Sequence, residues 1–250
     1  MTEEKKEEKR IMRKTSKIFG LAIVLILAMV LTVPAFAAEK EKVVKTGLVT
    51  ENGVNHIYSK PGVMVKKVPA YKLKVDGKVC YFSVDKKGVA TELTGMMKMA
   101  AKRLVSLKAG KKKSIANLKK AFKWSARLRY RNITKKLKGK KAAEYFGKYG
   151  FKTKSGDCNV AAYTFYWMAK VLGYKPKVIQ GHVPSGSMSN LKNHTWATIK
   201  FGKKTYYFDP DFNRAYAGKT VRTRSGMKQL GKYCGFKFLY GTPGTYVYKK

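Results

Sequence analysis

The sequence predicts an α+β protein in which helices pack on an antiparallel sheet, preceded by a small unit of β-hairpins. Two blocks of short β-type runs near the N-terminus each contain an Asn-Gly or Asp-Gly pair, which favours tight hairpin turns. Apolar residues then recur at helical spacing through much of residues 94–172. Two runs of alternating apolar residues follow, joined by a Gly-Lys-Lys turn, as expected of paired antiparallel strands.

Residues 1–37 have the pattern of a secretory signal peptide. A basic segment precedes an uncharged apolar run, residues 18–33, and then the sequence Ala35-Phe36-Ala37. We therefore expect cleavage after Ala37 and a secreted or cell-wall-associated protein, with Met12 as a second candidate start. The alternative is an uncleaved anchor, for which the apolar run is short. No later stretch is long and apolar enough to cross a membrane, so we expect no transmembrane span in the mature chain.

Residues 38–93 form the predicted hairpin unit. Asn52-Gly53 and Asp76-Gly77 mark the turns of two blocks that look like degenerate copies of one repeat. The blocks resemble the aromatic β-hairpin repeats of Gram-positive cell-wall-binding proteins, although Gly47-Leu48 stands where those repeats have Gly-Trp. The resemblance implies ligand binding by aromatic side chains, whereas a hairpin core is the alternative use of the same residues. These aromatic residues are Tyr58, Tyr81 and Phe82.

Residues 94–250 form the predicted second domain, which begins with helices. Thr94 and Ser114 stand at N-cap positions before two periodic segments, and a methionine stripe in the first segment is typical of packing. A short helix is expected from Lys140 to Gly147. A longer helix is expected from Cys158 to Leu172, since its apolar residues recur at helical spacing and a glycine follows it.

The end of the chain is predicted to complete the sheet. Residues 176–182 have the composition of a strand, and residues 184–190 are expected to form a mobile loop that flanks a substrate cleft. Beyond residue 211 the pattern is weaker, and it indicates a short helix over residues 225–233 and two closing strands within residues 236–248.

Cys158, His194 and Asp209 are the candidate catalytic residues. Cys158 opens a predicted helix, whose N-terminal N–H groups and partial positive charge favour a thiolate and can bind an oxyanion. If the strand turn centres on Gly202-Lys203, Asp209 lies opposite Trp196 and diagonal to His194, within side-chain reach. A thiolate, a base that also acts as an acid, and a carboxylate that holds the base are the requirements of nucleophilic catalysis at sulfur.

These segments resemble the transglutaminase-like superfamily of papain-like thiol enzymes. The family pattern is G-x-C at a helix start, H-x-W on a strand and an aspartate, often Asp-Pro, at the end of the next strand. The chain has Gly156-x-Cys158, His194-x-Trp196 and Asp209-Pro210, and the likeness covers about residues 114–213. It implies a transglutaminase-like, papain-like fold for residues 94–250.

The resemblance also implies a thiol acyl-transfer enzyme that acts on a protein or peptide substrate. Cys158 would attack a peptide bond or a glutamine carboxamide, His194 would move the proton and Asp209 would orient the imidazole. The thioester then passes to water, as in a cysteine protease or amidase, or to an amine, as in a transglutaminase. The catalytic residues serve both outcomes, so the two stay open.

The formal net charge of +41 predicts an anionic partner. For a secreted protein, anionic cell-envelope or wall polymers fit this charge better than nucleic acid does. The acidic side chains of residues 94–250 are Glu144, Asp157, Asp209 and Asp211. The alternative to an enzyme is a non-enzymatic envelope-binding protein, in which the triad is vestigial and the basic surface does the binding.

The three cysteines are too few for a disulfide scaffold. If Cys158 is the nucleophile, Cys80 and Cys234 either pair or stay reduced. The three histidines are far apart in the sequence and acidic residues are few, so no cluster has metal-ligand spacing. We therefore expect no metal ion and no cofactor.

Overall fold

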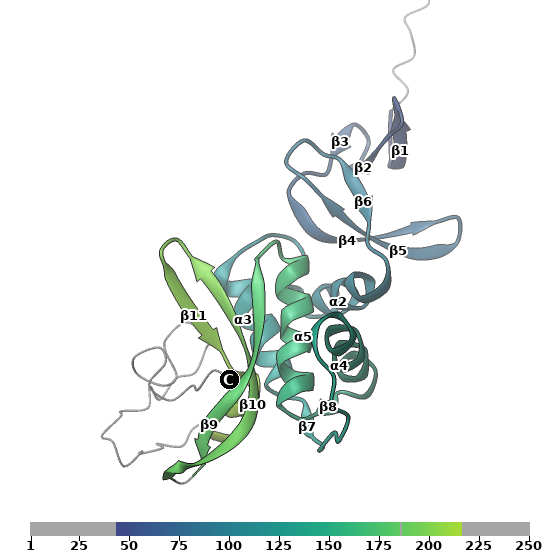
Figure 1. The fold of residues 1–250 in the computed structure, drawn as a ribbon. Helices are drawn as coiled ribbons and strands as arrows, with labels where there is room; N and C mark the ends of the chain where they lie inside the picture. The colour runs from purple at the N-terminus through teal and green to yellow at the C-terminus, as the bar shows by residue number, and fades with distance from the viewer. Residues whose placement is uncertain (1–43, 186, 217–250) are drawn as a thin grey trace, which may run out of the picture. The chain divides into compact units, whose positions relative to one another are not determined.

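The computed structural model describes residues 44–185 and 187–216 of the 250-residue chain (Figure 1). The predicted signal peptide, Cys234 and the elements expected over residues 225–248 lie outside the described residues. Within the described residues, none of the helices is long and apolar enough to cross a membrane.

The predicted hairpin unit consists of two three-stranded antiparallel sheets, in the orders β1-β2-β3 and β4-β5-β6 (Figure 1). Its strands are β1 Gly47–Glu51, β2 Val54–Lys60, β3 Val63–Met64, β4 Val68–Val75, β5 Lys78–Val84 and β6 Ala90–Glu92. Both predicted turns are confirmed, because Glu51 pairs with Val54 and Val75 pairs with Lys78. In each turn both central residues have positive φ, a conformation that Asn-Gly and Asp-Gly adopt readily.

Three aromatic side chains of the hairpin unit are buried. Tyr58, Tyr81 and Phe82 are only 8%, 6% and 2% exposed. Phe82 packs in a cluster with Ile57 and Val84, and the other buried members of that cluster are Val65 and Ala90. Burial at this level confirms the core interpretation for these three rings, whereas likeness to wall-binding repeats stays a prediction.

Five helices are described, and four of them carry the predicted helical patterns. They are α2 Gly95–Ser106, α3 Ile115–Ser125, α4 Gly139–Thr153, α5 Cys158–Val171 and α6 Pro210–Tyr216. Thr94 and Ser114 occupy the predicted N-cap positions of α2 and α3. Only the Ser114 side chain makes the cap bond, accepting a hydrogen bond from the Asn117 N–H at 3.2 Å. The short helix α6 was not predicted.

Helix α4 is longer than the predicted segment from Lys140 to Gly147. It continues to Thr153 because Gly147 and Gly150 are contact points with α5 rather than helix ends. A Cβ on Gly147 would lie 2.5 Å from the Trp167 ring, and one on Gly150 would lie 2.3 Å from the hydroxyl of Thr164. Glycine thus allows the two helices to pack closely, and this benefit outweighs its low helix propensity.

The predicted second domain contains a three-stranded antiparallel sheet in the order β11-β10-β9. Its strands are β9 Pro176–Ser185, β10 Ser187–Phe201 and β11 Lys204–Phe208. The prediction of a loop over residues 184–190 is wrong for its described residues, because β9 continues to Ser185, β10 begins at Ser187, and the two strands pair with a register shift between Ser187 and Leu191. Strand pairing at Ser185–Ser187 and at Pro184–Leu191 satisfies backbone groups at these positions, although the composition of the segment is that of a loop.

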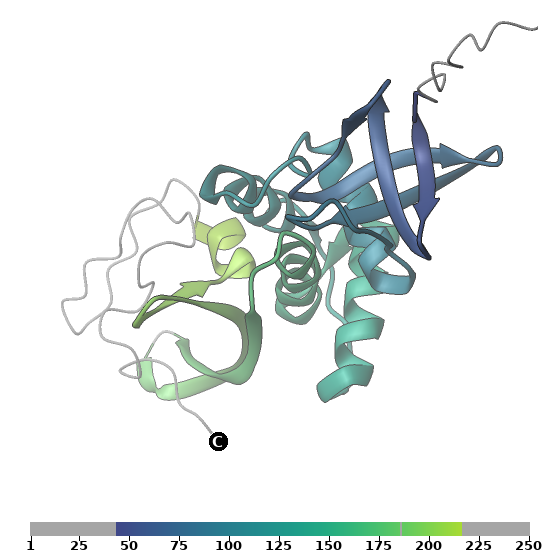
Figure 2. The same ribbon diagram turned by 90° about the horizontal axis from the view of Figure 1, so that it is seen from above.

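Helix α5 lies at the centre of residues 94–216, with the sheet on one side and α2 and α4 on the opposite side (Figures 1 and 2). Three buried rings join these layers: Phe122 of α3, Phe165 of α5 and Phe208 of β11. Their centroids lie 4.9–6.0 Å apart. Such pairs add about 0.5–1.5 kcal/mol each beyond the burial of apolar area. The predicted α+β class, with helices on an antiparallel sheet, is confirmed.

One hydrophobic cluster contains residues from both sides of the predicted domain boundary. Ala70 and Tyr81 of the hairpin strands belong to the same cluster as Leu104 and Ala109. The Ala70 N–H also donates to the carbonyl of Gly110 at 3.0 Å. The boundary between residues 93 and 94 stays a prediction.

Candidate active site

Cys158 is the first residue of α5, as predicted from its sequence context. The preceding Asp157 is the N-cap, and its carboxylate accepts a hydrogen bond from the Val160 N–H at 3.2 Å. Gly156 has φ 152°, and a Cβ there would lie 2.3 Å from the Val160 side chain. The Gly-x-Cys spacing therefore places a bare backbone against the first turn of the helix that carries the thiol.

A short parallel pair of strands holds the segment before Cys158. Strand β7 (Arg129–Tyr130) pairs with β8 (Ser155–Gly156). The Arg131 N–H donates to the carbonyl of Gly156 at 3.2 Å. These bonds fix the backbone two residues before the thiol, and the cap bond of Asp157 to Val160 fixes the first turn of α5. Cys158 is therefore held by contacts on both sides of it in the chain.

His194 and Asp209 come from neighbouring strands in the predicted register. Ala197 pairs with Phe208, so the next position along the ladder sets Trp196 opposite Asp209 and places His194 diagonal to it. His194 Nε2 and Asp209 Oδ2 are 2.6 Å apart, and the two side chains are 10% and 0% exposed. The second carboxylate oxygen of Asp209 accepts from the Phe212 N–H at 2.9 Å, at the start of α6.

Both oxygens of Asp209 are therefore engaged, and its orientation is determined by the fold. Burial by itself lowers the pKa of His194, but the charge and hydrogen bond of Asp209 raise it, and Cys158 adds to this effect. The net result is a His194 pKa raised well above its usual value. The geometry favours an imidazolium that is hydrogen-bonded to a carboxylate on one side and adjacent to a thiol on the other.

The fold brings the three predicted residues into one place. Cys158 Sγ and a ring nitrogen of His194 lie within 4.8 Å of each other, and His194 contacts Asp209 as described above. Because Nε2 is bonded to Asp209, Nδ1 is the nitrogen that is oriented for the thiol. The assembly of the three side chains is a structural fact, and their catalytic roles are addressed below as a proposal.

Two further site residues, Asp211 and Arg214, were not predicted. A carboxylate oxygen of Asp211 lies within 4.8 Å of both the Cys158 thiol and a His194 nitrogen. Arg214 forms an ion pair with Asp211 one turn along α6. Burial is the main cause that raises the pKa of Asp211, and Asp209 adds to it, while Arg214 and His194 oppose it. The available signal was Pro210 at a helix start, followed by an Asp-x-x-Arg pair at helical spacing.

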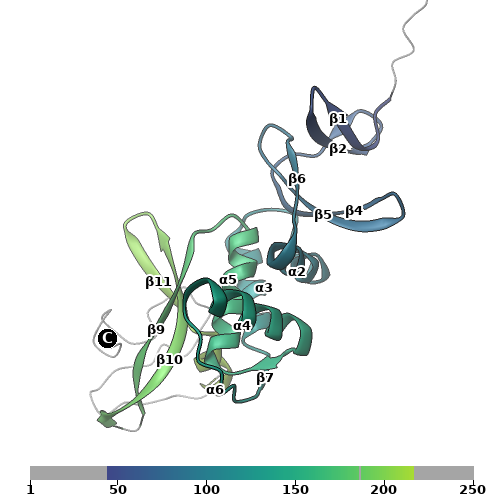
Figure 3. The same ribbon diagram turned by 45° about the vertical axis from the view of Figure 1, so that its right-hand side comes forward.

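Arg214 also joins α6 to the segment before the thiol. Its Nη1 donates to the carbonyl of Gly156 at 3.1 Å and to that of Leu128 at 3.3 Å. The guanidinium lies 4.8 Å from the centre of the Tyr130 ring. Figure 3 shows α6 beside β7, the strand that contains Tyr130. One side chain thus connects the helix that follows Asp209 to the strands that precede Cys158.

A second connection, also not predicted, joins the neighbours of Cys158 and His194. Thr195 donates a hydrogen bond from its hydroxyl to the amide oxygen of Asn159 at 2.8 Å. Asn159 in turn donates to Asp157 at 3.4 Å, and Gln180 donates to Asn159 at 3.5 Å. These residues are far apart in the sequence and follow no motif, so the sequence contains no signal for the contact.

The chain is similar to known proteins over part of its length. Residues 102–210 match the sequence profile of the family described as "Transglutaminase-like superfamily". Among solved structures, the chain is similar to a Cytophaga hutchinsonii protein named "putative cysteine protease", with 12% identity and a TM-score of 0.33. That match covers 47% of this chain and 39% of the other. A search of curated proteins found no match. Residues 102–210 of this chain are thus similar in sequence to the transglutaminase-like superfamily.

Proposed function

We propose that the protein is a secreted thiol enzyme that transfers an acyl group from a peptide bond or a glutamine carboxamide. The observation that carries the proposal is the chain of contacts from Cys158 through His194 to Asp209 within a transglutaminase-like domain. Cys158 is the nucleophile, His194 the general acid and base, and Asp209 the group that orients the imidazole.

In the first half-reaction the Cys158 thiolate attacks the amide carbonyl. The backbone N–H groups at the start of α5 are placed to stabilise the negative charge that develops on the carbonyl oxygen. His194 gives its proton to the leaving amine as the C–N bond breaks, and a thioester on Cys158 results. Asp209 holds the ring throughout, because its two oxygens are bonded to Nε2 and to the Phe212 N–H.

In the second half-reaction His194 takes a proton from the incoming nucleophile, which attacks the thioester and releases the thiolate. Water gives hydrolysis, and a primary amine gives transfer. The same three groups serve both, so the proposal covers a cysteine protease or amidase and a transglutaminase. A peptide library that includes glutamine donors, incubated with and without an added amine, separates these outcomes by the mass of the products.

The direct test is the Cys158→Ala variant. We expect it to lose acyl transfer completely while keeping the melting temperature of the wild type, because the side chain is small and only part-buried. Cys158 should also alkylate faster than Cys80 at about pH 6, where an ordinary thiol is almost wholly protonated. Wild-type turnover in the alanine variant would reject the proposal.

Secretion is part of this proposal, and its support is the sequence of residues 1–37. We expect N-terminal sequencing of the exported protein to begin at Ala38. Retention of residues 18–33 in that material would indicate an anchor instead.

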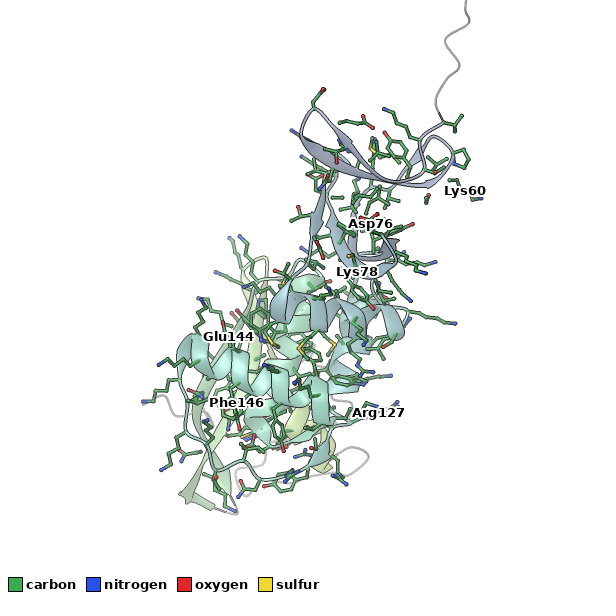
Figure 4. All side chains as sticks on the ribbon, turned by 90° about the vertical axis from the view of Figure 1, so that its right-hand side faces the viewer. Lys60, Asp76, Lys78, Arg127, Glu144 and Phe146 are labelled. Atoms are coloured by element: carbon green, nitrogen blue, oxygen red, sulfur yellow. The ribbon has the colours of Figure 1, made fainter. Side chains whose placement is uncertain are left out.

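A second candidate function is adhesion to an anionic cell envelope, with or without catalysis. The observation that favours it is the placement of the acidic side chains. Of the four in residues 94–250, three lie at the site: Asp157, Asp209 and Asp211. Glu144 is the remaining one, so the described surface of this domain away from the site is almost purely cationic. Figure 4 shows nitrogen-tipped side chains projecting around it. Equal, slow alkylation of Cys158 and Cys80 would favour this binding role over an enzyme.

A further inference from the structure

Three different metal-binding side chains converge at the candidate active site. The thiol of Cys158, a ring nitrogen of His194 and a carboxylate oxygen of Asp211 all lie within 4.8 Å of one another. We propose that these three side chains form a binding site for a borderline-soft divalent cation such as Zn²⁺, and that the bound ion holds the thiol in an inactive state. The metal site stands whether or not the protein transfers acyl groups, whereas the off-switch rests on the proposed function.

The donor set matches the chemistry of zinc. Thiolate, imidazole and carboxylate are its usual ligands, and three protein ligands with one open position are typical of accessible zinc sites. Tetrahedral zinc holds sulfur and nitrogen donors about 3.5 Å apart, so donors within 4.8 Å converge on one ion by about 1 Å of side-chain movement. All three residues are part-exposed, so an ion can reach them from solvent.

The groups around the three donors support the same assignment. Ligating histidines generally donate their second ring N–H to a carboxylate, which fixes the tautomer and the ring orientation. His194 already has this partner, because Nε2 lies 2.6 Å from Asp209 and leaves Nδ1 for the ion. Ligating carboxylates are in turn hydrogen-bonded, and Asp211 has Arg214 as its partner. Both ligands thus already have neighbours that orient them.

The charge of the site also favours a cation. Asp209 and Asp211 contribute two carboxylates, and the thiol becomes a third negative group when it loses its proton to bind the ion. Arg214 opposes them with one positive charge, and the His194 imidazolium adds a second one until the ion displaces its proton. In the rest of residues 94–250, Glu144 is the only other acidic side chain outside the α5 cap. The site is therefore where a divalent cation is attracted within an otherwise cationic domain.

Metal binding and acyl transfer exclude each other, because both use the same sulfur and the same nitrogen. On binding, the thiol and the imidazolium release their protons to solvent, and the metal forms bonds to Sγ and Nδ1. The ion occupies the position from which the thiolate attacks a carbonyl. A chelator then restores the free thiol, so the site acts as a reversible metal-dependent off-switch.

The test measures binding directly on the purified, tag-free protein. Zn²⁺ is titrated against a competing chelator, and Co²⁺ is used as a probe because cobalt bound to a thiolate gives a charge-transfer absorption in the near ultraviolet. We expect one ion per chain, no Co²⁺–thiolate band in Cys158→Ala, and an affinity at least about tenfold weaker in Asp211→Asn. The matched control is Asp76→Asn, the same change in the β4–β5 turn (Figure 4), which should bind like the wild type.

Two further measurements make the outcome decisive. Bound Zn²⁺ should protect Cys158 from alkylation while Cys80, mapped in the same digest, reacts at its usual rate. Mg²⁺ and Ca²⁺ should not protect, because these hard cations prefer oxygen ligands. Equal affinity of the wild type and Asp211→Asn, or binding that survives in Cys158→Ala, would overturn the proposal. An inactive protein that still binds zinc through these residues would contradict the proposed function alone.

Discussion

The hydroxyl of Thr195 is a small group with a large positional role. It joins the neighbour of His194 to Asn159, the neighbour of Cys158, by a 2.8 Å hydrogen bond, and Thr195 is 3% exposed. A hydrogen bond of this kind contributes about 0.5–1.5 kcal/mol to stability. The bond therefore helps to set the separation of the thiol and the imidazole, although neither Thr195 nor Asn159 reacts.

We predict that Thr195→Val lowers kcat by about tenfold or more with little change in KM, because a small displacement of reacting groups slows the reaction strongly. Thr195→Ser keeps the donor and should retain most of the activity. Steady-state kinetics on the substrate found in the peptide library check this, with melting temperatures as a control. Equal rates for the valine and serine variants would show that the hydroxyl does not position the site.

Asp85 gives the hairpin unit a pH-dependent contribution to stability. Its carboxylate accepts from the N–H groups of Val89 at 2.9 Å and Lys87 at 2.8 Å. The backbone bond from Val89 is the main cause that lowers the pKa of this exposed carboxyl. A lowered folded-state pKa stabilises the fold above the unfolded pKa of about 3.9, and this contribution is lost as the pH falls through the folded value.

We predict that the stability difference between the wild type and Asp85→Asn is constant above about pH 5 and shrinks below about pH 4. Urea denaturation of both proteins across this range measures it. A difference that grows on acidification would have the wrong sign for this mechanism. Asp76→Asn, the same change in the turn between β4 and β5, serves as the control.

At the scale of elements, helix α6 joins the two parts of the candidate site. Asp209 at its start holds His194, and Arg214 near its end holds the carbonyls of Leu128 and Gly156 before the thiol. One short helix therefore connects the end of the strand that leads to Asp209 with the backbone that precedes Cys158. The position of α6 should control how the two halves of the site meet.

We predict that Arg214→Lys and Arg214→Ala both lower turnover by about tenfold or more, because an ammonium cannot reproduce the planar donor fork of a guanidinium. The rate of Cys158 alkylation should also change in these two variants, since the segment before the thiol loses its hydrogen bonds to Arg214. Arg127→Ala is the matched control, because Arg127 is exposed (Figure 4). Wild-type turnover in Arg214→Lys would show that a single positive charge is enough.

At the scale of the whole molecule, the net charge of +41 sets the behaviour toward anionic surfaces. The basic side chains are distributed over nearly every segment, so the attraction is diffuse. Exposed charges are screened within about 10 Å at 0.1 M salt. Single exposed ion pairs contribute roughly 0–1 kcal/mol, so no individual lysine should dominate.

We predict that binding to anionic vesicles or isolated cell wall falls steeply across roughly 0.05–0.5 M salt, while turnover of a short neutral peptide changes little. Co-sedimentation at increasing salt measures the first quantity and steady-state kinetics the second. Adhesion that survives high salt but disappears when residues 46–93 are deleted would contradict diffuse binding. It would indicate specific recognition by the hairpin unit.

The sequence by itself determined the α+β class, both hairpin turns, the start of α5 at Cys158 and the register of β10 with β11. Each of these depends on local rules. Asn-Gly and Asp-Gly select their turn, a glycine and a cap open a helix, and the alternation of a strand decides which residues share a face. The proximity of His194 and Asp209 could be predicted because a single short turn connects their strands.

Only the tertiary structure decided the rest. Helix α4 runs through Gly147 and Gly150 because α5 packs against them, and β9 and β10 pair through a segment with the composition of a loop. Arg214 contacts a carbonyl 86 residues earlier in the chain, and Asp211 approaches the thiol only because α6 folds back beside it. Contacts of this kind depend on how distant elements pack, so they cannot be predicted from periodicity or spacing along the chain.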